Sequence, residues 1–291
     1  MKTIVCGGSG FLGSHLADLL TECGHEVTIL DRRPSTYATP SQRMVVADIL
    51  DRDAVAEALR GTDAVYHLAG IVDLEEAAAS PLDTVEQNVR GTVGLLEAAV
   101  AAGVKRFIYA STVYVYSQLG GFYRCSKQAS ELYIEEYERR HGLPYTILRY
   151  GTLYGPRADA RNSVWRYLHQ GLTQGKILFT GTGEEIREYV HVRDAARLSV
   201  DILAKEYANQ HILITGYQPM KTRDMLRMIQ EMLQGRVTIE YAEPLDNAHY
   251  TLTPYSFVPK IGRKLVGTSY IDMGQGLLEC LHDIPAAHDA A

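Results

Sequence analysis

The sequence predicts an α/β fold in which a doubly wound parallel sheet is followed by a smaller C-terminal α/β region. Two observations carry this prediction. In the first half of the 291-residue chain, short apolar runs alternate with stretches whose apolar residues recur at helical spacing, and a cluster of glycines directly follows the first run. Such alternation builds βαβ units, whose parallel strands are covered by helices on both faces.

Six short apolar runs predict six strands. They lie at residues 3–6, 27–30, 44–47, 64–69, 106–110 and 145–148. Helical spacing of apolar residues begins between the first two runs with Leu12, Leu16, Leu19 and Leu20, and continues at residues 53–59, 82–102 and 123–141. We therefore expect strands and helices to alternate through about residue 150, with right-handed crossovers.

The second half of the chain is less regular. Gly155, Pro156 and Gly181 mark turns, and residues 224–233 have the pattern of an amphipathic helix. We expect two regions, residues 1–152 and residues 153–291, and we expect part of the second region to return to the sheet.

Composition and charge exclude several classes of protein. The net charge is −6 and the basic residues are not clustered, which argues against a nucleic-acid partner. No stretch approaches the ~18 continuous apolar residues of a membrane span, and the N-terminus lacks the apolar segment of a signal peptide. The cysteines are far apart, and no His, Cys and Asp cluster has metal-ligand spacing. These features are typical of a soluble cytoplasmic enzyme with no metal.

The glycine cluster predicts a dinucleotide-binding turn. Residues 7–13 read Gly-Gly-Ser-Gly-Phe-Leu-Gly, which satisfies both GxGxxG and GxxGxxG. Glycines permit the tight turn and let backbone N–H groups at a helix N-terminus approach a pyrophosphate. The contacts expected here are Gly7, Gly10, Phe11, Leu12 and Gly13.

Asp31 bears on the identity of the dinucleotide. It ends the second predicted strand, at the ~20-residue distance from Gly10 expected of an acid that bonds the ribose 2′-hydroxyl. A carboxylate repels a 2′-phosphate, which favours NAD over NADP. Arg32 and Arg33 leave NADP as an alternative, since either could reach a 2′-phosphate or could simply be solvated.

Matches to one family run in order along the chain. They are residues 7–13, Asp31, Asp48 with Ile49, residues 67–70, Asn88 with Gly91 and Thr92, Ser111 with Thr112, Tyr123 with Lys127, residues 148–150, residues 154–157 and residues 187–194. Through these residues the chain resembles the extended short-chain dehydrogenase/reductases, and in particular the NAD-dependent nucleotide-sugar epimerases and dehydratases, UDP-glucose 4-epimerase among them. The resemblance implies that residues 1–152 form a NAD-binding Rossmann domain and that residues 153–291 mainly bind substrate.

The resemblance implies that Tyr123 transfers the proton, Lys127 assists it and Thr112 binds the substrate hydroxyl. A tyrosine with a pKa near ~10 needs a shift of roughly 3 units to act as a base at neutral pH, about 4 kcal/mol. One positive charge ~4 Å away at an effective dielectric of ~20 supplies about that much. Lys127 lies one helical turn after Tyr123 and can share its face. A second Tyr-xxx-Lys, Tyr217 to Lys221, contains Pro219 and is interpreted as chance.

Further contacts are implied by the same resemblance. The cofactor contacts beyond the glycine turn are Asp31, Arg32, Asp48, Ile49, Leu68, Ala69, Gly70, Asn88, Ser111, Tyr123, Lys127 and Tyr150. Asp48 could instead cap the helix after it, Asn88 could lie on a helix surface, and the Ser111 and Thr112 hydroxyls could be ordinary strand-end groups. The substrate contacts are Thr112, Tyr123, Thr152 and Arg187, where Arg187 suits a nucleotide diphosphate or a surface ion pair.

The sequence departs from the family pattern in three places. Thr112 and Tyr123 are separated by about half the usual number of residues, so the sugar pocket should be more open or filled by another segment. Val113 and Tyr114 replace the acidic pair of the 4,6-dehydratases, which disfavours dehydration. Thr152 lies near the place where UDP-sugar epimerases often have Asn, so UDP recognition is not secured.

The leading functional hypothesis is a nucleotide-sugar 4-epimerase that oxidises its substrate transiently to a 4-keto sugar. A 4-keto nucleotide-sugar reductase or dehydrogenase would use the same residues. A non-catalytic, cofactor-sensing protein is a third hypothesis, against which the set Thr112, Tyr123 and Lys127 speaks. By analogy with relatives, we expect a homodimer formed through the helices at residues 82–102 and 123–141.

Overall fold

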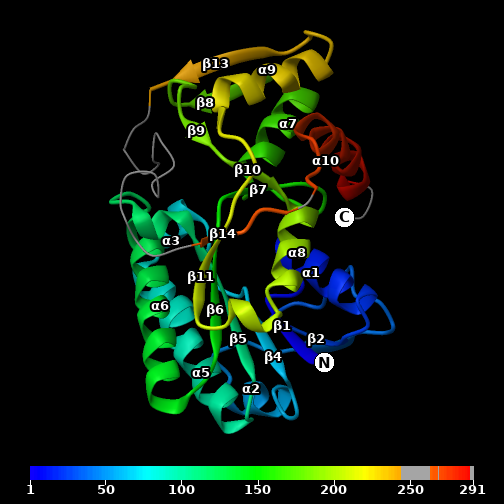
Figure 1. Ribbon diagram of the computed structural model, residues 1–291. Helices are drawn as coiled ribbons and strands as arrows, with labels where there is room; N and C mark the ends of the chain where they lie inside the picture. Colours follow the sequence, from blue (N-terminus) through cyan, green and yellow to red (C-terminus); the bar gives the residue numbers. More distant parts are fainter. Residues whose placement is uncertain (244–262, 268, 289–291) are drawn as a thin grey trace.

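An eight-stranded parallel sheet forms the centre of the chain in a computed structural model that describes residues 1–243, 263–267 and 269–288 (Figure 1). The strand order is β14-β11-β6-β5-β4-β1-β2-β3. The strands are β1 (Lys2–Cys6), β2 (Glu26–Asp31), β3 (Arg43–Val46), β4 (Ala64–His67), β5 (Arg106–Thr112), β6 (Tyr145–Tyr150), β11 (Gln210–Ile214) and β14 (Arg263–Lys264). The predicted fold class is confirmed, and each of the six expected strands is present.

Helices cover both faces of this sheet, as the alternation predicts. Side chains of α1 (Phe11–Glu22) and α8 (Val192–Asp201) pack on one face, against strand residues such as Val5 and Ile29. Side chains of α2 (Arg52–Ala58), α5 (Gly91–Ala101) and α6 (Gly121–His141) pack on the other face. Successive residues of β1 illustrate the division, because Ile4 belongs to one apolar cluster and Val5 to the other.

The helix expected at residues 82–102 is interrupted. It consists of α4 (Pro81–Thr84), a π-helical segment η1 (Val85–Arg90) and then α5. A π-helical turn inside a helix shifts the residues that follow it relative to the helix face, and such turns frequently occur at functional sites. Asn88 lies in this segment. A short helix α3 (Leu74–Ala79), which the apolar pattern did not predict, precedes α4.

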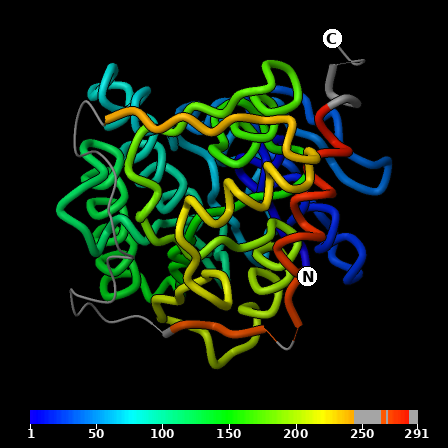
Figure 2. Tube along the Cα trace, turned by 90° about the horizontal axis from the view of Figure 1, so that it is seen from above, coloured from blue at the N-terminus to red at the C-terminus, as the bar shows by residue number. Residues whose placement is uncertain are grey.

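The remaining elements form a second, smaller cluster above the sheet in Figure 1. Its apolar core is built from α7 (Ser163–Gln174), α9 (Thr222–Met232) and α10 (Met273–His288), together with β8 (Lys176–Thr180), which pairs with β13 (Thr238–Ala242). Two further small pairs join β7 (Thr152–Tyr154) to β10 (Tyr189–His191) and β9 (Ile186–Arg187) to β12 (Met220–Lys221). Figures 1 and 2 both place α10 on the side of α1, opposite α6.

Arg157 links α10 of this cluster to α1. The Arg157 guanidinium pairs with Asp18 at 2.8 Å, and the Arg157 backbone N–H donates to Asp283 of α10 at 2.6 Å. The second cluster lies over the carboxyl ends of the sheet strands, and Arg157 joins it to α1 of the sheet layer. None of the helices in the described parts of the chain has the length and apolar character needed to cross a bilayer.

Candidate active site

The glycine turn after β1 is shaped by close backbone approach. Gly7 has φ +86°, and its N–H donates to Leu30 of β2 at 2.8 Å. A Cβ on Gly13 would lie 2.2 Å from the Gly7 carbonyl oxygen, so only glycine fits there. Gly10 is the N-cap of α1, and no side chain caps the helix. The first-turn N–H groups, which include Phe11 and Leu12, therefore form a site suited to a pyrophosphate.

Asp31 lies beside this turn at the carboxyl end of β2. One carboxylate oxygen accepts the Ser9 N–H at 3.1 Å, and the other accepts the Arg33 N–H at 3.2 Å. These contacts hold the carboxylate at the edge of the glycine turn, where a ribose hydroxyl would meet it.

A pocket of about 370 Å³ adjoins this edge and is lined by Arg32, Leu50, Ile71, Glu76, Asp83, Glu86 and Gln87. Asp48 lies next to it, accepting the Leu50 N–H at 2.9 Å and facing Gln87 at 3.5 Å. Asp51 rather than Asp48 caps α2, by accepting the Ala54 N–H at 3.1 Å. The Ile49 side chain is 5% exposed and packs into the sheet core.

Leu68, Ala69 and Gly70 follow β4 and lie against the glycine turn. A Cβ on Gly7 would meet the Ala69 nitrogen at 2.7 Å, and a Cβ on Gly70 would meet the Asn88 side-chain oxygen at 2.5 Å. Asn88 is 1% exposed. Its amide accepts from the Ile71 N–H at 2.7 Å and donates to the Ile71 carbonyl at 2.8 Å and to Ser126 at 2.9 Å. Asn88 therefore joins the segment after β4 to α6, and the interpretation as a surface residue is excluded.

The structure brings Thr112, Tyr123 and Lys127 together at the carboxyl end of β5. Thr112 lies close enough to the Tyr123 hydroxyl to lower its pKa, and the Thr112 hydroxyl accepts the Tyr114 N–H at 3.2 Å. The Lys127 ammonium lies 5.8 Å from the centroid of the Tyr123 ring and donates to the Ala110 carbonyl at 2.9 Å. Tyr123 is 9% exposed and Lys127 is 2% exposed, so water is largely excluded from both groups.

Burial dominates the acidity of both residues. Burial raises the pKa of Tyr123 to about 12, although the neighbouring Thr112 side chain lowers it. Burial lowers the pKa of Lys127 to about 8, although the negative charge of Glu131 raises it. The expected lowering of the Tyr123 pKa by Lys127 is therefore not achieved by the protein groups alone, because the cost of desolvating a phenolate is larger.

Two of the residues expected to contact the cofactor direct their hydroxyl groups into the protein. The Ser111 hydroxyl, on a residue that is 4% exposed, donates to Glu131 at 2.6 Å. The Tyr150 hydroxyl is 2.6 Å from the hydroxyl of Ser199 on α8. Neither hydroxyl is directed at the glycine turn.

Thr152 and Arg187 lie in the small strand pairs of the second cluster. The Thr152 N–H donates to the Glu188 carbonyl at 3.3 Å, which fixes β7 beside β10. Arg187 is half-buried in β9, and its guanidinium donates to the Ile186 carbonyl at 3.1 Å. Among the residues that the structure describes, no group of His, Cys, Asp and Glu is arranged to hold a metal ion.

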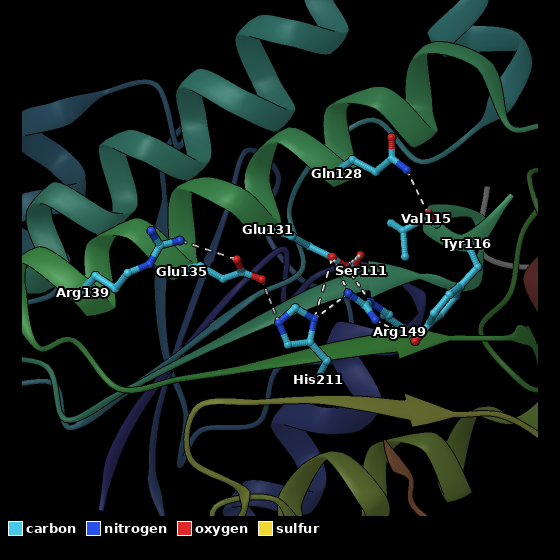
Figure 3. A network of polar contacts seen from close by, with 9 residues as sticks. All are labelled: Ser111, Val115, Tyr116, Gln128, Glu131, Glu135, Arg139, Arg149 and His211. Carbon is cyan, nitrogen blue, oxygen red and sulfur yellow. Dashed lines mark hydrogen bonds and ion pairs between the residues drawn. The ribbon is translucent and has the colours of Figure 1, made fainter. Parts of the chain in front are cut away.

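A buried network of polar side chains adjoins Tyr123 and Lys127, and Glu131, Arg149 and His211 within it were not predicted as site residues (Figure 3). Arg149 of β6 donates to Glu131 through two nitrogens, at 3.0 and 2.7 Å, and to the Tyr116 hydroxyl at 2.6 Å. His211 of β11 contacts Arg149 and lies 3.0 Å from Glu135. Two signals in the sequence could have identified this network. Arg149 is a charged residue directly after the predicted strand 145–148, and Glu131 is an acid four residues after Lys127.

Comparison with known proteins identifies the family. The model of the NAD dependent epimerase/dehydratase family matches residues 3–215. The UDP-N-acetyl-alpha-D-glucosaminuronate decarboxylase of Bacillus cytotoxicus is 30% identical over 260 residues, which cover 80% of this chain and 78% of that protein. A putative UDP-glucose 4-epimerase of Methanocaldococcus jannaschii is 26% identical over 270 residues, covering 86% and 88%.

A solved structure extends the likeness to almost the whole chain. The UDP-glucuronic acid 4-epimerase from Bacillus cereus, in complex with UDP-glucuronic acid and NAD, superposes with a TM-score of 0.86 at 23% identity and covers 99% of this chain and 100% of that one. At this identity the superposition establishes a shared fold. The family match and the sequence relatives carry the assignment further: the chain belongs to the NAD-dependent epimerase/dehydratase family.

Proposed function

We propose that this protein is an NAD-dependent nucleotide-sugar 4-epimerase. The observation that carries the proposal is the meeting of Thr112, Tyr123 and Lys127 at the carboxyl end of β5, in the same sheet edge as the glycine turn. Ligands of open α/β sheets bind at this edge. The names of the relatives, which include UDP-sugar 4-epimerases, support the same reaction class.

The residues around the glycine turn fit NAD. Gly7, Gly10 and Gly13 leave room for a pyrophosphate at the start of α1, and Asp31 is placed for a ribose hydroxyl. The adjoining pocket is lined by three carboxylates, those of Glu76, Asp83 and Glu86, and by one guanidinium, that of Arg32. This balance of charge disfavours a 2′-phosphate, which supports NAD over NADP.

The chain's own residues provide the proton transfer. When bound, NAD would supply a hydride acceptor and a positive charge. Thr112 orients the sugar 4-oxygen, and Tyr123 takes the 4-hydroxyl proton as C4 is oxidised and returns it to the same oxygen when the 4-keto sugar is reduced on its opposite face. Lys127 holds its ammonium against the Tyr123 ring, where it favours the phenolate. The low exposure of both side chains keeps water from the keto intermediate.

The segment between Thr112 and Tyr123 supports epimerisation over dehydration. Residues Val113–Tyr116 form a 3-10 helix, η2, whose Val113 side chain is 2% exposed. The Tyr114 ring meets the Tyr123 ring edge-on, with 6.4 Å between centroids. Apolar and aromatic side chains thus occupy the positions where elimination of water would require an acid and a base.

We place the nucleotide diphosphate near Thr152 and Arg187, in the cluster formed mainly by residues 153–291. Both residues lie in the strand pairs β7–β10 and β9–β12, which belong to that cluster and not to the large sheet. A guanidinium there is suited to a diphosphate because it can donate two parallel hydrogen bonds.

Exposed apolar side chains support a homodimer formed through α4, η1 and α6. Leu82 is 82% exposed and Val85 51%, while Phe122, Leu132 and Tyr133 of α6 are 52%, 64% and 47% exposed. Large apolar groups gathered on neighbouring helices are typical of an interface between subunits. The four free cysteines fit a reducing cytoplasmic location.

One assay on the purified protein tests the reaction. With bound NAD and no external redox partner, a panel of UDP-, dTDP-, GDP- and CDP-sugars should yield the C4 epimer of at least one substrate, with no net reduction of the cofactor. Stoichiometric change in the ultraviolet absorbance of the reduced nicotinamide would instead establish a 4-keto reductase or dehydrogenase. Cofactor binding without turnover of any sugar would leave the cofactor-sensing hypothesis.

A further inference from the structure

Three consecutive residues of β5 meet three consecutive turns of α6. The Ala110 carbonyl accepts from Lys127 at 2.9 Å, the Ser111 hydroxyl donates to Glu131 at 2.6 Å, and Thr112 lies beside the Tyr123 hydroxyl, whose pKa it lowers. We call these six residues the strand–helix seam. Tyr123, Lys127 and Glu131 lie four residues apart on one face of the helix, so the two bonds constrain the register of Tyr123 against Thr112.

We propose that Glu131, held by Arg149, is a positioning residue for the proton-transfer site: it fixes the register of Thr112 against Tyr123 and keeps a negative charge next to Lys127. The proposal rests on the proposed function for its catalytic consequence. Glu131 touches neither the reacting phenol nor the glycine turn, so its role is exerted through Ser111 and Lys127.

Arg149 is placed to hold Glu131 in one orientation. It is the cross-strand partner of Ser111 in the β5–β6 pair, and it donates to both carboxylate oxygens of Glu131 in a bidentate arrangement. The side chains of Arg149 and Glu131 are only 4% and 8% exposed. Burying such a pair is costly unless every polar atom is satisfied, and a satisfied pair has one well-defined geometry.

The same guanidinium holds the short segment that leads to Tyr123. It donates to the Tyr116 hydroxyl at 2.6 Å and lies 4.8 Å from the centroid of the Tyr116 ring. Gln128 of α6 adds a second bond to this segment, donating to the Val115 carbonyl at 2.9 Å. The first part of the segment that replaces a longer loop, η2, is therefore fastened to β6 through Arg149 and to α6 through Gln128 (Figure 3).

His211 completes the support as a neutral imidazole. Arg149 has no acceptor, so Nδ1 of His211, which faces it, must accept, and Nε2 then donates to Glu135 at 3.0 Å. Burial and the Arg149 guanidinium lower the pKa of His211, while Glu131 and Glu135 raise it. Protonation at Nδ1 would place a donor against Arg149 and would loosen the network.

Replacement of the whole pair separates positioning from folding. In Glu131→Leu/Arg149→Met both charges are removed together, which avoids leaving one of them buried and unpaired. We expect a Tm within a few degrees of the parent and a kcat reduced between ~10- and ~100-fold with KM little changed, because the reacting groups lose their register. A folded double variant with kcat within about twofold of the parent would overturn the proposal.

Glu131→Gln tests the electrostatic part without any assay of turnover. With carbon-13 at Lys Cε, and the Lys127 signal identified by its loss in Lys127→Met, the ammonium should titrate at a clearly lower pH in Glu131→Gln than in the parent. Glu136→Gln, which removes a solvent-facing carboxylate of the same helix, should leave that titration unchanged. An unshifted Lys127 signal in Glu131→Gln contradicts the proposal, even if the parent shows no epimerase activity; absence of that activity alone contradicts only the proposed function.

Discussion

The two halves of the sheet edge, the glycine turn and the strand–helix seam, are built by different means. The glycine turn is defined by the backbone, since a Cβ on Gly13 would come within 2.2 Å of a carbonyl oxygen and no side chain caps α1. The seam is defined by residues of β5 and α6 that meet in the folded chain, and it is supported by side chains of β6 and β11 that are nearly all buried. A backbone site depends on a short continuous stretch of sequence, whereas the seam depends on residues that meet only after folding.

The largest effect should come from the seam. Tyr123→Phe removes the proton-transfer group while keeping the ring, so we expect kcat to fall between ~100- and ~10 000-fold, the usual range for a general acid–base group. NAD affinity measured by calorimetry should be almost unchanged, because the glycine turn is intact. Tyr133→Phe, an exposed tyrosine of the same helix, is the matched control and should retain full activity.

Damage to the glycine turn should instead weaken the binding of NAD. In Gly13→Ala the new methyl group meets the Gly7 carbonyl, and relief of this clash should cost about 1–3 kcal/mol of stability and displace the pyrophosphate site. We expect NAD affinity to fall by at least ~10-fold, as calorimetry would show. Gly94→Ala, at a helical glycine with no atom within 4 Å of the added Cβ, should bind NAD normally. Equal losses of NAD affinity in Gly13→Ala and Gly94→Ala would contradict the assignment of NAD binding to the glycine turn.

The sequence predicts the backbone-defined half better than the side-chain half. The glycine spacing and Asp31 are local features with a known mechanism, and the strand and helix order follows from periodicity. Ser111 was expected at the cofactor, but its hydroxyl donates to Glu131, which lies 20 residues away in the sequence. No local pattern shows that Arg149, Glu131 and His211 meet, because the distances between them are set by the register of three strands against α6. The π-helical segment around Asn88 is likewise decided by tertiary packing and not by propensity.

A pH dependence should follow from the buried ammonium of the seam. Burial lowers the pKa of Lys127 to about 8, so the lysine is charged below that pH and neutral above it. Activity that requires the charged form should therefore decline above pH about 8, by up to about tenfold per unit. Stability should respond in the opposite sense. Above the folded pKa the unfolded chain binds the extra proton, so the contribution of Lys127 becomes more favourable as the pH rises from about 8 towards the ordinary lysine value.

Profiles of kcat/KM and of Tm against pH measure the two responses. Lys127→Arg keeps its charge throughout this range and should remove the alkaline decline from whatever activity it retains. An unchanged alkaline limb in Lys127→Arg would assign the decline to another group.

The outer face of α6 should matter least for the chemistry. The inner face of this helix carries Tyr123, Lys127 and Glu131, and the outer face carries Phe122 and Leu132, which are 52% and 64% exposed. Leu132→Glu places a charge on the proposed subunit interface, where its burial is unfavourable. We expect sedimentation to show a monomer or a dimer weakened by at least ~10-fold, with kcat per subunit changed less than about threefold.

Leu178→Glu offers a control on β8, where the leucine is 47% exposed but lies far from α6 along the chain and belongs to the second cluster. It should leave the oligomeric state unchanged. If Leu132→Glu instead abolished turnover while the protein stayed folded, the two faces of α6 could not be independent. A helix that is held only by its inner face would tolerate the new charge at Leu132. Loss of turnover would therefore mean that the register of the strand–helix seam depends on the subunit contact as well as on Arg149.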